Sequence, residues 1–166
     1  MSLDSVQLHL SKVAPDLEVI ITEDSSATVQ LAAAAHNVEP GQIAKTLSFK
    51  VKENVFLLVA RGDARLDNKK AKAAFGGKAK MLAADEVAEL TSHPVGGVCP
   101  FGLPSPIKVY CDVSLRAYDV VIPAAGATNA AVRISPNQMV EITDADWVDV
   151  CQPPQPAEYS GVDFNS

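Results

Sequence analysis

The chain has 166 residues, of which 48% are hydrophobic and 5% aromatic, with a formal net charge of −6. This length suits one domain whose core is filled by aliphatic side chains, and the acidic balance argues against indiscriminate nucleic-acid or DNA binding. No apolar run reaches the roughly 18–20 residues of a membrane helix, and the N-terminus lacks the basic and apolar regions of a secretory signal. Three cysteines without a CxxC pair favour free thiols, so we expect a cytoplasmic protein with no membrane partner.

The first half of the chain predicts two helices and a hairpin. Apolar residues at helical spacing predict a helix over 2–14, which Pro15 ends, and LEVIIT over 17–22 predicts a short strand. Ser25 or Ser26 can cap a second helix that runs through TVQLAAAAHN. Strands are then expected over 43–51 and 54–60, and the short KEN segment between them favours a hairpin.

The second half of the chain alternates short helices with short strands. Helices are expected over 68–75 and 84–90, strands over 80–83, 107–112, 119–123 and 130–135, and Pro136 starts a turn or short helix before 139–142. The tail is rich in proline and polar residues, so we expect an ordered domain over 1–151 and disorder over 152–166. These elements predict an α+β fold, a single compact domain with a mixed sheet wrapped by helices.

A lysine interrupts the apolar face of the strand over 43–51. Because side chains alternate between the faces of a strand, Lys45 shares its face with four apolar residues, namely Ile43, Leu47, Phe49 and Val51. Burying an unpaired ammonium is costly, so this lysine either reaches solvent, finds a partner or lines a cleft.

The segment HPVGGVCPFG is the second feature that suggests chemistry. Two glycines between prolines make a rigid loop whose backbone N–H groups can approach a ligand closely, although an ordinary loop has the same composition. Together with a cation, such a loop could hold a phosphate, a carboxylate or the oxyanion of an acyl transfer. Cys99 within it is a candidate nucleophile or a small apolar filler.

Other chemical motifs are absent from the sequence. It contains no GxSxG, HExxH, Walker A or GxGxxG pattern, and its three histidines are not spaced as metal ligands, so no metal or cofactor is expected. Positive charge is concentrated between Arg61 and Lys80, which hold seven of the fourteen Lys and Arg residues against two aspartates. This segment is either a solvated helix face or a landing surface for a phosphate backbone.

Four blocks in order carry a resemblance: EPGQIAKTLSFKV, RLDNKKAKAAFGGKAKMLAADEVAELT, PVGGVCPFGL and AAGATNAAVRISPNQM. They resemble the YbaK/ProX family, free-standing relatives of the editing domain of bacterial prolyl-tRNA synthetases, over roughly residues 17–150. The family implies a mixed sheet wrapped by helices. It also implies a catalytic Lys45 and substrate contacts from matching positions, which are Thr46, Thr91, Gly96, Gly97, Pro100 and Gly126. One departure is Ser92, where the family often has glycine.

The resemblance implies a trans-editing hydrolase that removes a small amino acid, such as alanine or cysteine, from the 3′ end of a mischarged tRNA. tRNA-Pro is one candidate carrier, and an aminoacyl-tRNA synthetase is a further candidate partner. In the implied mechanism a water attacks the ester, the N–H groups of Gly96 and Gly97 stabilise the oxyanion, and Lys45 anchors the substrate. The basic segment would then contact tRNA through Lys69, Lys70 and Lys72. Two alternatives remain, a non-catalytic aminoacyl-tRNA or nucleotide-binding module of the same fold and a small-molecule esterase or amidase that uses Cys99.

Overall fold

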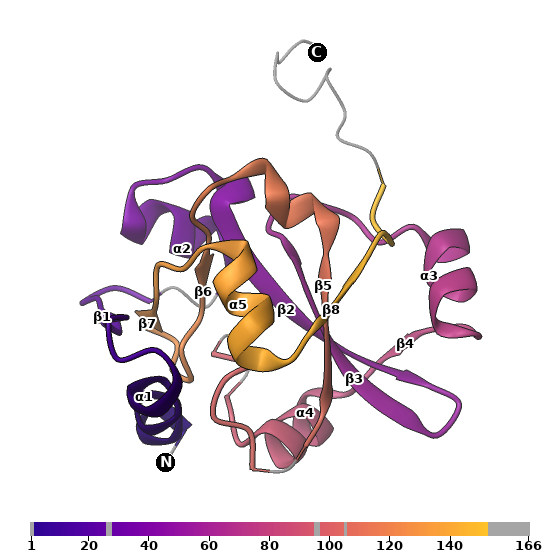
Figure 1. Ribbon diagram of the computed structural model, residues 1–166, viewed down its shortest axis with the longest axis horizontal. Coiled ribbons are helices and arrows are strands. Elements are labelled where there is room, and N and C mark those ends of the chain that lie inside the picture. The colour runs from indigo at the N-terminus through magenta and orange to yellow at the C-terminus, as the bar shows by residue number, and fades with distance from the viewer. Residues whose placement is uncertain (1, 26–27, 95–96, 105, 153–166) are drawn as a thin grey trace, which may run out of the picture.

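A six-stranded mixed sheet runs through the centre of the molecule, with helices packed on both of its faces (Figure 1). The computed structural model describes residues 2–25, 28–94, 97–104 and 106–152. The helices are α1 (Ser2–Val13), α2 (Val29–His36), α3 (Asn68–Phe75), α4 (Ala84–Thr91) and α5 (Pro136–Thr143), with short 3-10 helices η1 (Pro40–Gln42) and η2 (Val113–Ala117). The strands are β1 (Ile20–Ile21), β2 (Ile43–Val51), β3 (Asn54–Arg61), β4 (Lys80–Met81), β5 (Lys108–Asp112), β6 (Ile122–Pro123), β7 (Ala130–Ala131) and β8 (Asp146–Val148). The expected α+β class is therefore confirmed.

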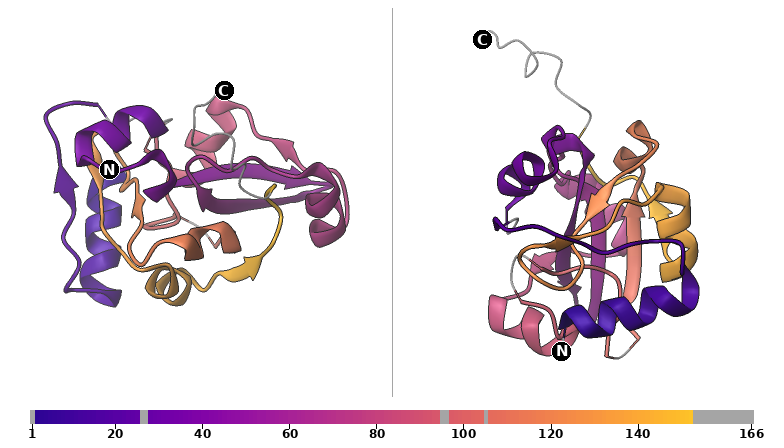
Figure 2. Two further views of the ribbon diagram at one scale, coloured as in Figure 1. Left: turned by 90° about the horizontal axis from the view of Figure 1, so that it is seen from above. Right: turned by 90° about the vertical axis from the view of Figure 1, so that its left-hand side faces the viewer.

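The antiparallel hairpin of β2 and β3 is the longest feature of the sheet, and it projects away from α1 and α2 (Figure 2, left). The strand order is β4-β2-β3-β5-β8, in which β5 runs parallel to β3 and β8 runs parallel to β5. β6 pairs in parallel with the beginning of β2, at Ile43 and Ala44. A separate two-stranded sheet joins β1 to β7. No helix in the described ranges is both long and apolar enough to cross a membrane.

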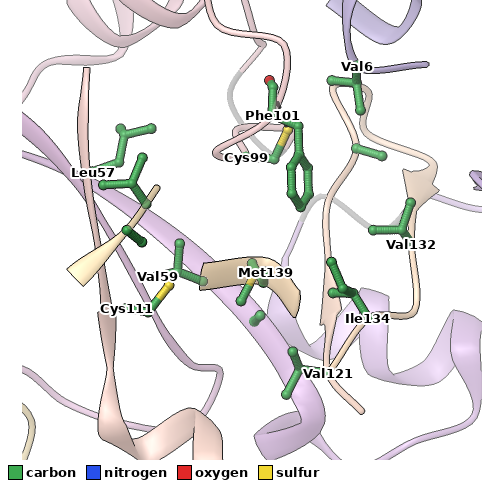
Figure 3. Packing of buried hydrophobic residues seen from close by; sticks show 14 of the residues in the cluster. Val6, Leu57, Val59, Cys99, Phe101, Cys111, Val121, Val132, Ile134 and Met139 are labelled. Carbon is green, nitrogen blue, oxygen red and sulfur yellow. Dashed lines mark hydrogen bonds between the residues drawn. The ribbon is translucent and has the colours of Figure 1, made fainter. Parts of the chain in front are cut away.

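Each face of the hairpin packs on its own hydrophobic cluster. Leu57 and Val59 of β3 contact the larger cluster, to which α1 contributes Val6 and α5 contributes Met139 (Figure 3). Phe56 and Leu58 face the opposite cluster, which α3 covers and which also holds Phe49 and Val51 of β2. The continuous apolar run of β3 thus has both faces buried, as its sequence predicts.

The expected boundaries hold for the long elements and fail for the short strands. The helix over 68–75 is observed at those residues, and Asp67 caps it by accepting hydrogen bonds from Lys69 N and Lys70 N. The cap of α2 differs from the expectation, because Thr28 rather than Ser25 accepts the bond from Leu31 N, and Ser26 lies outside the described residues. The expected strands over 17–22, 119–123 and 130–135 shrink to two residues each.

The end of the described chain pairs with the loop after β3. Cys151 forms an isolated bridge with Leu66, and Gln152 N donates to Arg65 O at 2.8 Å. Asp112, which is buried, accepts from Val150 N and Ser114 N and so fixes this segment beside the sheet. Pairing therefore extends one residue past the expected boundary at 151, and the disordered tail stays a prediction.

Candidate active site

A gap in the outer edge of the sheet defines the candidate site. β2 pairs with β6 at Ile43 and Ala44 and with β4 at Phe49 and Lys50, so no strand within the described residues pairs with this edge at residues 45–47. In an antiparallel hairpin, alternate residues direct their N–H and C=O groups away from the partner strand. The bond from Leu82 N to Ser48 O at 3.1 Å shows that Ser48 is one of these outward residues, so Thr46, two residues away, is another.

A cavity of about 320 Å³ occupies this gap. Its wall is mainly aliphatic, with residues from β2, α2, β6, β7 and the start of α4. Representative lining residues are Val29 and Ala32 of α2, Val87 of α4, and Val98 and Ala124 from the two loops that close it. No acidic and no aromatic side chain lines it within the part of the chain that the structure describes. The wall therefore suits a small uncharged organic group.

Thr46 is the residue of this edge with unmet hydrogen-bonding capacity. Its side chain lies in the cavity wall, and its Oγ1 atom is buried without a hydrogen-bond partner among the described residues. Its N–H belongs to the stretch of the edge that none of the described strands pairs with. A buried hydroxyl without a partner costs about 1–3 kcal/mol, and such a cost is typical of a position kept for a ligand.

Lys45 lies on the face of β2 that carries Leu47 and Phe49, as the alternation predicts, and it also lines the cavity. Its Nζ atom donates to Ala64 O at 2.6 Å, so the partly buried ammonium has a hydrogen-bond partner. Burial lowers the pKa of Lys45 from its ordinary value, an effect that Asp63 opposes and Arg65 reinforces. An ammonium has three donors, so one bond to Ala64 leaves the group able to contact a ligand as well.

The two glycine loops meet beside the cavity, but Gly97 does not offer a free donor. Gly97 N donates to Pro94 O at 2.9 Å, and Gly97 O accepts from Gly126 N at 3.0 Å. A side chain at Gly97 would meet the backbone of Ala127 at 2.8 Å, so close packing explains this glycine. Gly126 has φ +91°, a conformation that favours glycine. Gly97 N is thus already bonded within its own loop, the oxyanion donor expected there stays a prediction, and Gly96 lies outside the described residues.

Thr91 and Pro100 lie apart from the cavity wall. Thr91 is buried, with its hydroxyl donating to Val87 O at 2.7 Å and accepting from His93 N at 3.1 Å, which favours a structural role over substrate contact. Pro100 lines a different cavity, beside α1. Ser92, the departure from the expected family pattern, is exposed and ends α4 in the left-handed conformation with φ +62°, which glycine adopts more readily than serine.

Cys99 and His93 bring a thiol and an imidazole together, with Sγ 3.5 Å from Nε2. Both side chains are almost completely buried, and Figure 3 shows Cys99 packed beside Phe101. Since Nε2 lies 2.8 Å from Phe101 O, which can only accept, it carries the proton and cannot act as a base toward the thiol. Burial raises the pKa of Cys99 to about 12, so the esterase alternative loses its nucleophile.

The three lysines of α3 differ in their surroundings. Lys69 and Lys72 are exposed. Lys70 forms an ion pair with Asp149 and donates to Cys151 O, both at 3.2 Å, and so ties α3 to the end of the described chain. These contacts favour a structural role for Lys70, while the other two lysines remain available to a phosphate backbone.

Sequence reasoning missed most of the cavity wall. Val29, Ala32 and Val87 occupy ordinary apolar positions of helices, and nothing in their residue type separates a cavity wall from a core. Thr46 carried a weak signal, since it is a polar residue of a strand that has both faces covered.

Comparison with known proteins places these features in a family. The sequence model of the aminoacyl-tRNA editing domain matches residues 23–142, so the chain belongs to this family of editing domains. It is similar to the uncharacterized protein YwhH of Bacillus subtilis (strain 168), with 46% identity over 92% of this chain and 98% of that protein. It is also 33% identical, over 61% of its length, to the proline–tRNA ligase of Bacillus cytotoxicus, but that match spans 18% of the ligase.

Solved structures agree with the family. A proposed trans-editing enzyme for prolyl tRNA synthetase has 33% identity and a TM-score of 0.84, covering 92% of this chain and 98% of its own. The hypothetical protein APE2540 has 33% identity and a TM-score of 0.83, covering 89% and 99% of the two chains. The resemblance to free-standing editing domains is therefore confirmed, as is the fold that it implied.

Proposed function

We propose that this protein is a trans-editing hydrolase, which cleaves the ester between a small amino acid and the 3′-terminal ribose of a mischarged tRNA. The observation that carries the proposal is the cavity at the unpaired edge of β2, where Thr46 has an unpartnered buried hydroxyl. Membership of the editing-domain family supplies the class of substrate.

The proposed mechanism assigns carbonyl polarisation to Thr46. Its N–H, with its hydroxyl after rotation about χ1, donates to the ester carbonyl oxygen and stabilises the negative charge that develops there. A water attacks the carbonyl carbon, the bond between this carbon and the ribose oxygen breaks, and a proton from the water passes to the ribose oxygen as it leaves. No protein nucleophile is needed, because an aminoacyl ester is already activated and requires mainly positioning.

Lys45 places positive charge beside the same cavity. The ammonium keeps its bond to Ala64 O and uses another donor to hold an oxygen of the terminal nucleotide. Its burial strengthens such a contact, because the effective dielectric around the group is lower than in water.

The aliphatic wall sets the proposed specificity. A volume of about 320 Å³ lies at the small end of the range for ligand sites, and apart from Lys45, which the proposal assigns to the terminal nucleotide, the described wall offers no charged partner for a substrate side chain. Esters of alanine, cysteine and residues of similar size are therefore the expected substrates, with tRNA-Pro as one carrier. Such a substrate places the reaction in the cytoplasm.

A deacylation panel tests the proposal. Purified protein is incubated with tRNAs mischarged with alanine, cysteine, serine, aspartate and phenylalanine, and release of the amino acid is followed over time. We expect turnover of the small residues and at least tenfold slower release of aspartate and phenylalanine. Tight binding of alanyl-tRNA without release would instead favour the non-catalytic binding module.

A further inference from the structure

Two lysines face each other on neighbouring strands next to the cavity. Lys50 of β2 and Lys80 of β4 are direct partners in the antiparallel register, so their Cβ atoms lie about 5 Å apart on one face of the sheet. Lys80 is exposed and Lys50 is partly exposed. None of the three ion pairs found among the described residues includes either lysine. Like charges in direct opposition are destabilising, so this arrangement is unfavourable unless an anion joins it.

The position of this pair relates it to the proposed substrate. Lys50 has the same parity as Thr46 and Ser48, so all three side chains leave the same face of β2. Ser48 of β2 and Met81 and Leu82, which follow Lys80, line the cavity. The lysine pair thus lies directly beside residues of the cavity wall. α3 packs on the opposite face of the sheet, so its lysines form a separate surface.

We propose that Lys50 and Lys80 form a phosphate-binding pair that holds the single-stranded 3′ end of the substrate RNA while its terminal nucleotide occupies the cavity. This inference rests on the proposed function for the identity of its ligand. A phosphodiester between the two ammonium groups accepts a charge-assisted hydrogen bond from each and relieves their repulsion. Contacts to the backbone position the RNA without reading its sequence, so the pair serves any tRNA acceptor end.

The test uses an unacylated RNA tetranucleotide that ends in CCA, with the full-length protein at several salt concentrations. Lys50→Glu should weaken binding at least tenfold, and Lys80→Glu should do the same. The slope of log affinity against log salt should fall by about 0.7 for each phosphate that the variant no longer neutralises. Lys12→Glu makes the same charge change on an exposed residue of α1 and should alter the affinity less than twofold.

Thermal unfolding distinguishes this role from damage to the fold. Without RNA, Lys50→Glu should raise Tm, because it converts a repulsive cross-strand pair into an attractive one. The same variant should lose the rise in Tm that the tetranucleotide gives the wild type. Equal weakening by Lys12→Glu, or unchanged tetranucleotide binding in Lys50→Glu, would overturn the proposal.

Hydrolysis of alanyl-adenosine separates the two proposals, because this ester contains no phosphate. Lys50→Glu should hydrolyse it at the wild-type rate. If the wild type binds the tetranucleotide through Lys50 but does not hydrolyse alanyl-adenosine or alanyl-tRNA, the phosphate site stands and the hydrolase proposal fails. If the wild type hydrolyses these esters but neither lysine variant weakens tetranucleotide binding, the hydrolase proposal stands and the phosphate site fails.

Discussion

Replacing Thr46 with valine should change stability and activity in opposite directions. Valine has nearly the same shape and a higher strand preference, so the substitution removes the hydroxyl with little repacking. The Oγ1 atom of Thr46 is buried without a partner, and leaving such a group unsatisfied costs about 1–3 kcal/mol. We therefore expect Thr46→Val to gain about 1 kcal/mol, which corresponds to roughly 2–4 °C in Tm for a domain of this size.

Activity should fall in the same variant. If the hydroxyl helps to stabilise the oxyanion, its loss resembles the loss of one oxyanion donor, which costs about 10²–10³-fold in rate. The assay measures kcat/KM for alanyl-adenosine together with thermal unfolding monitored by circular dichroism. A less stable valine variant would show that the hydroxyl has a partner, and an unchanged kcat/KM would remove Thr46 from the mechanism.

Thr91 provides the matched control. Its hydroxyl is buried like that of Thr46, but it bonds to Val87 O and His93 N. Thr91→Val leaves a buried N–H unsatisfied, so it should lose about 1–2 kcal/mol of stability. Since Thr91 does not line the cavity, kcat/KM of the folded variant should stay within threefold of wild type. Comparing stability and kcat/KM for the two variants therefore distinguishes a hydroxyl that contacts the substrate from one that stabilises the fold.

Three other predictions each concern a single residue. Lys45→Met should lower alanyl-adenosine hydrolysis at least 10²-fold while the protein stays folded. The control Lys70→Met, which also loses a bond to a backbone carbonyl, should leave hydrolysis unchanged, and similar rates for both variants would contradict a role for Lys45. Ser92→Gly should raise the free energy of unfolding by about 0.5–1 kcal/mol, since Ser92 has φ +62° and glycine adopts this conformation without strain. Urea unfolding measures this free energy, and a loss of stability would refute the backbone argument. Burial lowers the pKa of His93 below its ordinary value of 6.5, so the unfolded state binds the proton first and stability should fall as the pH drops below about 6.5. His93→Gln should therefore reduce the difference in Tm between pH 7 and pH 5, and an unchanged difference would contradict this role of His93.

The long elements, the fold class and the family could be predicted from the amino-acid sequence alone. The two strands of the hairpin and the helix over 68–75 follow from local rules, because their apolar spacing and the cap at Asp67 act within a few residues. The lysine at 45 was recognisable because it breaks an alternation that is itself local. The short strands β1, β6 and β7 could not be delimited, since two-residue strands exist only through their partners.

Which of these residues share a site became visible only in the folded chain. The gap in the edge of β2 depends on where β4 and β6 stop, and both are added by chain that lies far from β2 in the sequence. That gap makes Thr46 a candidate donor, while Gly97 N, the donor that the glycine motif suggested, is bonded to Pro94 O. The register likewise places Lys50 opposite Lys80, although the two lie far apart along the chain. Hydrogen-bond satisfaction and strand register are non-local properties, because each depends on which distant backbone group comes within reach, and no pattern along the chain encodes them.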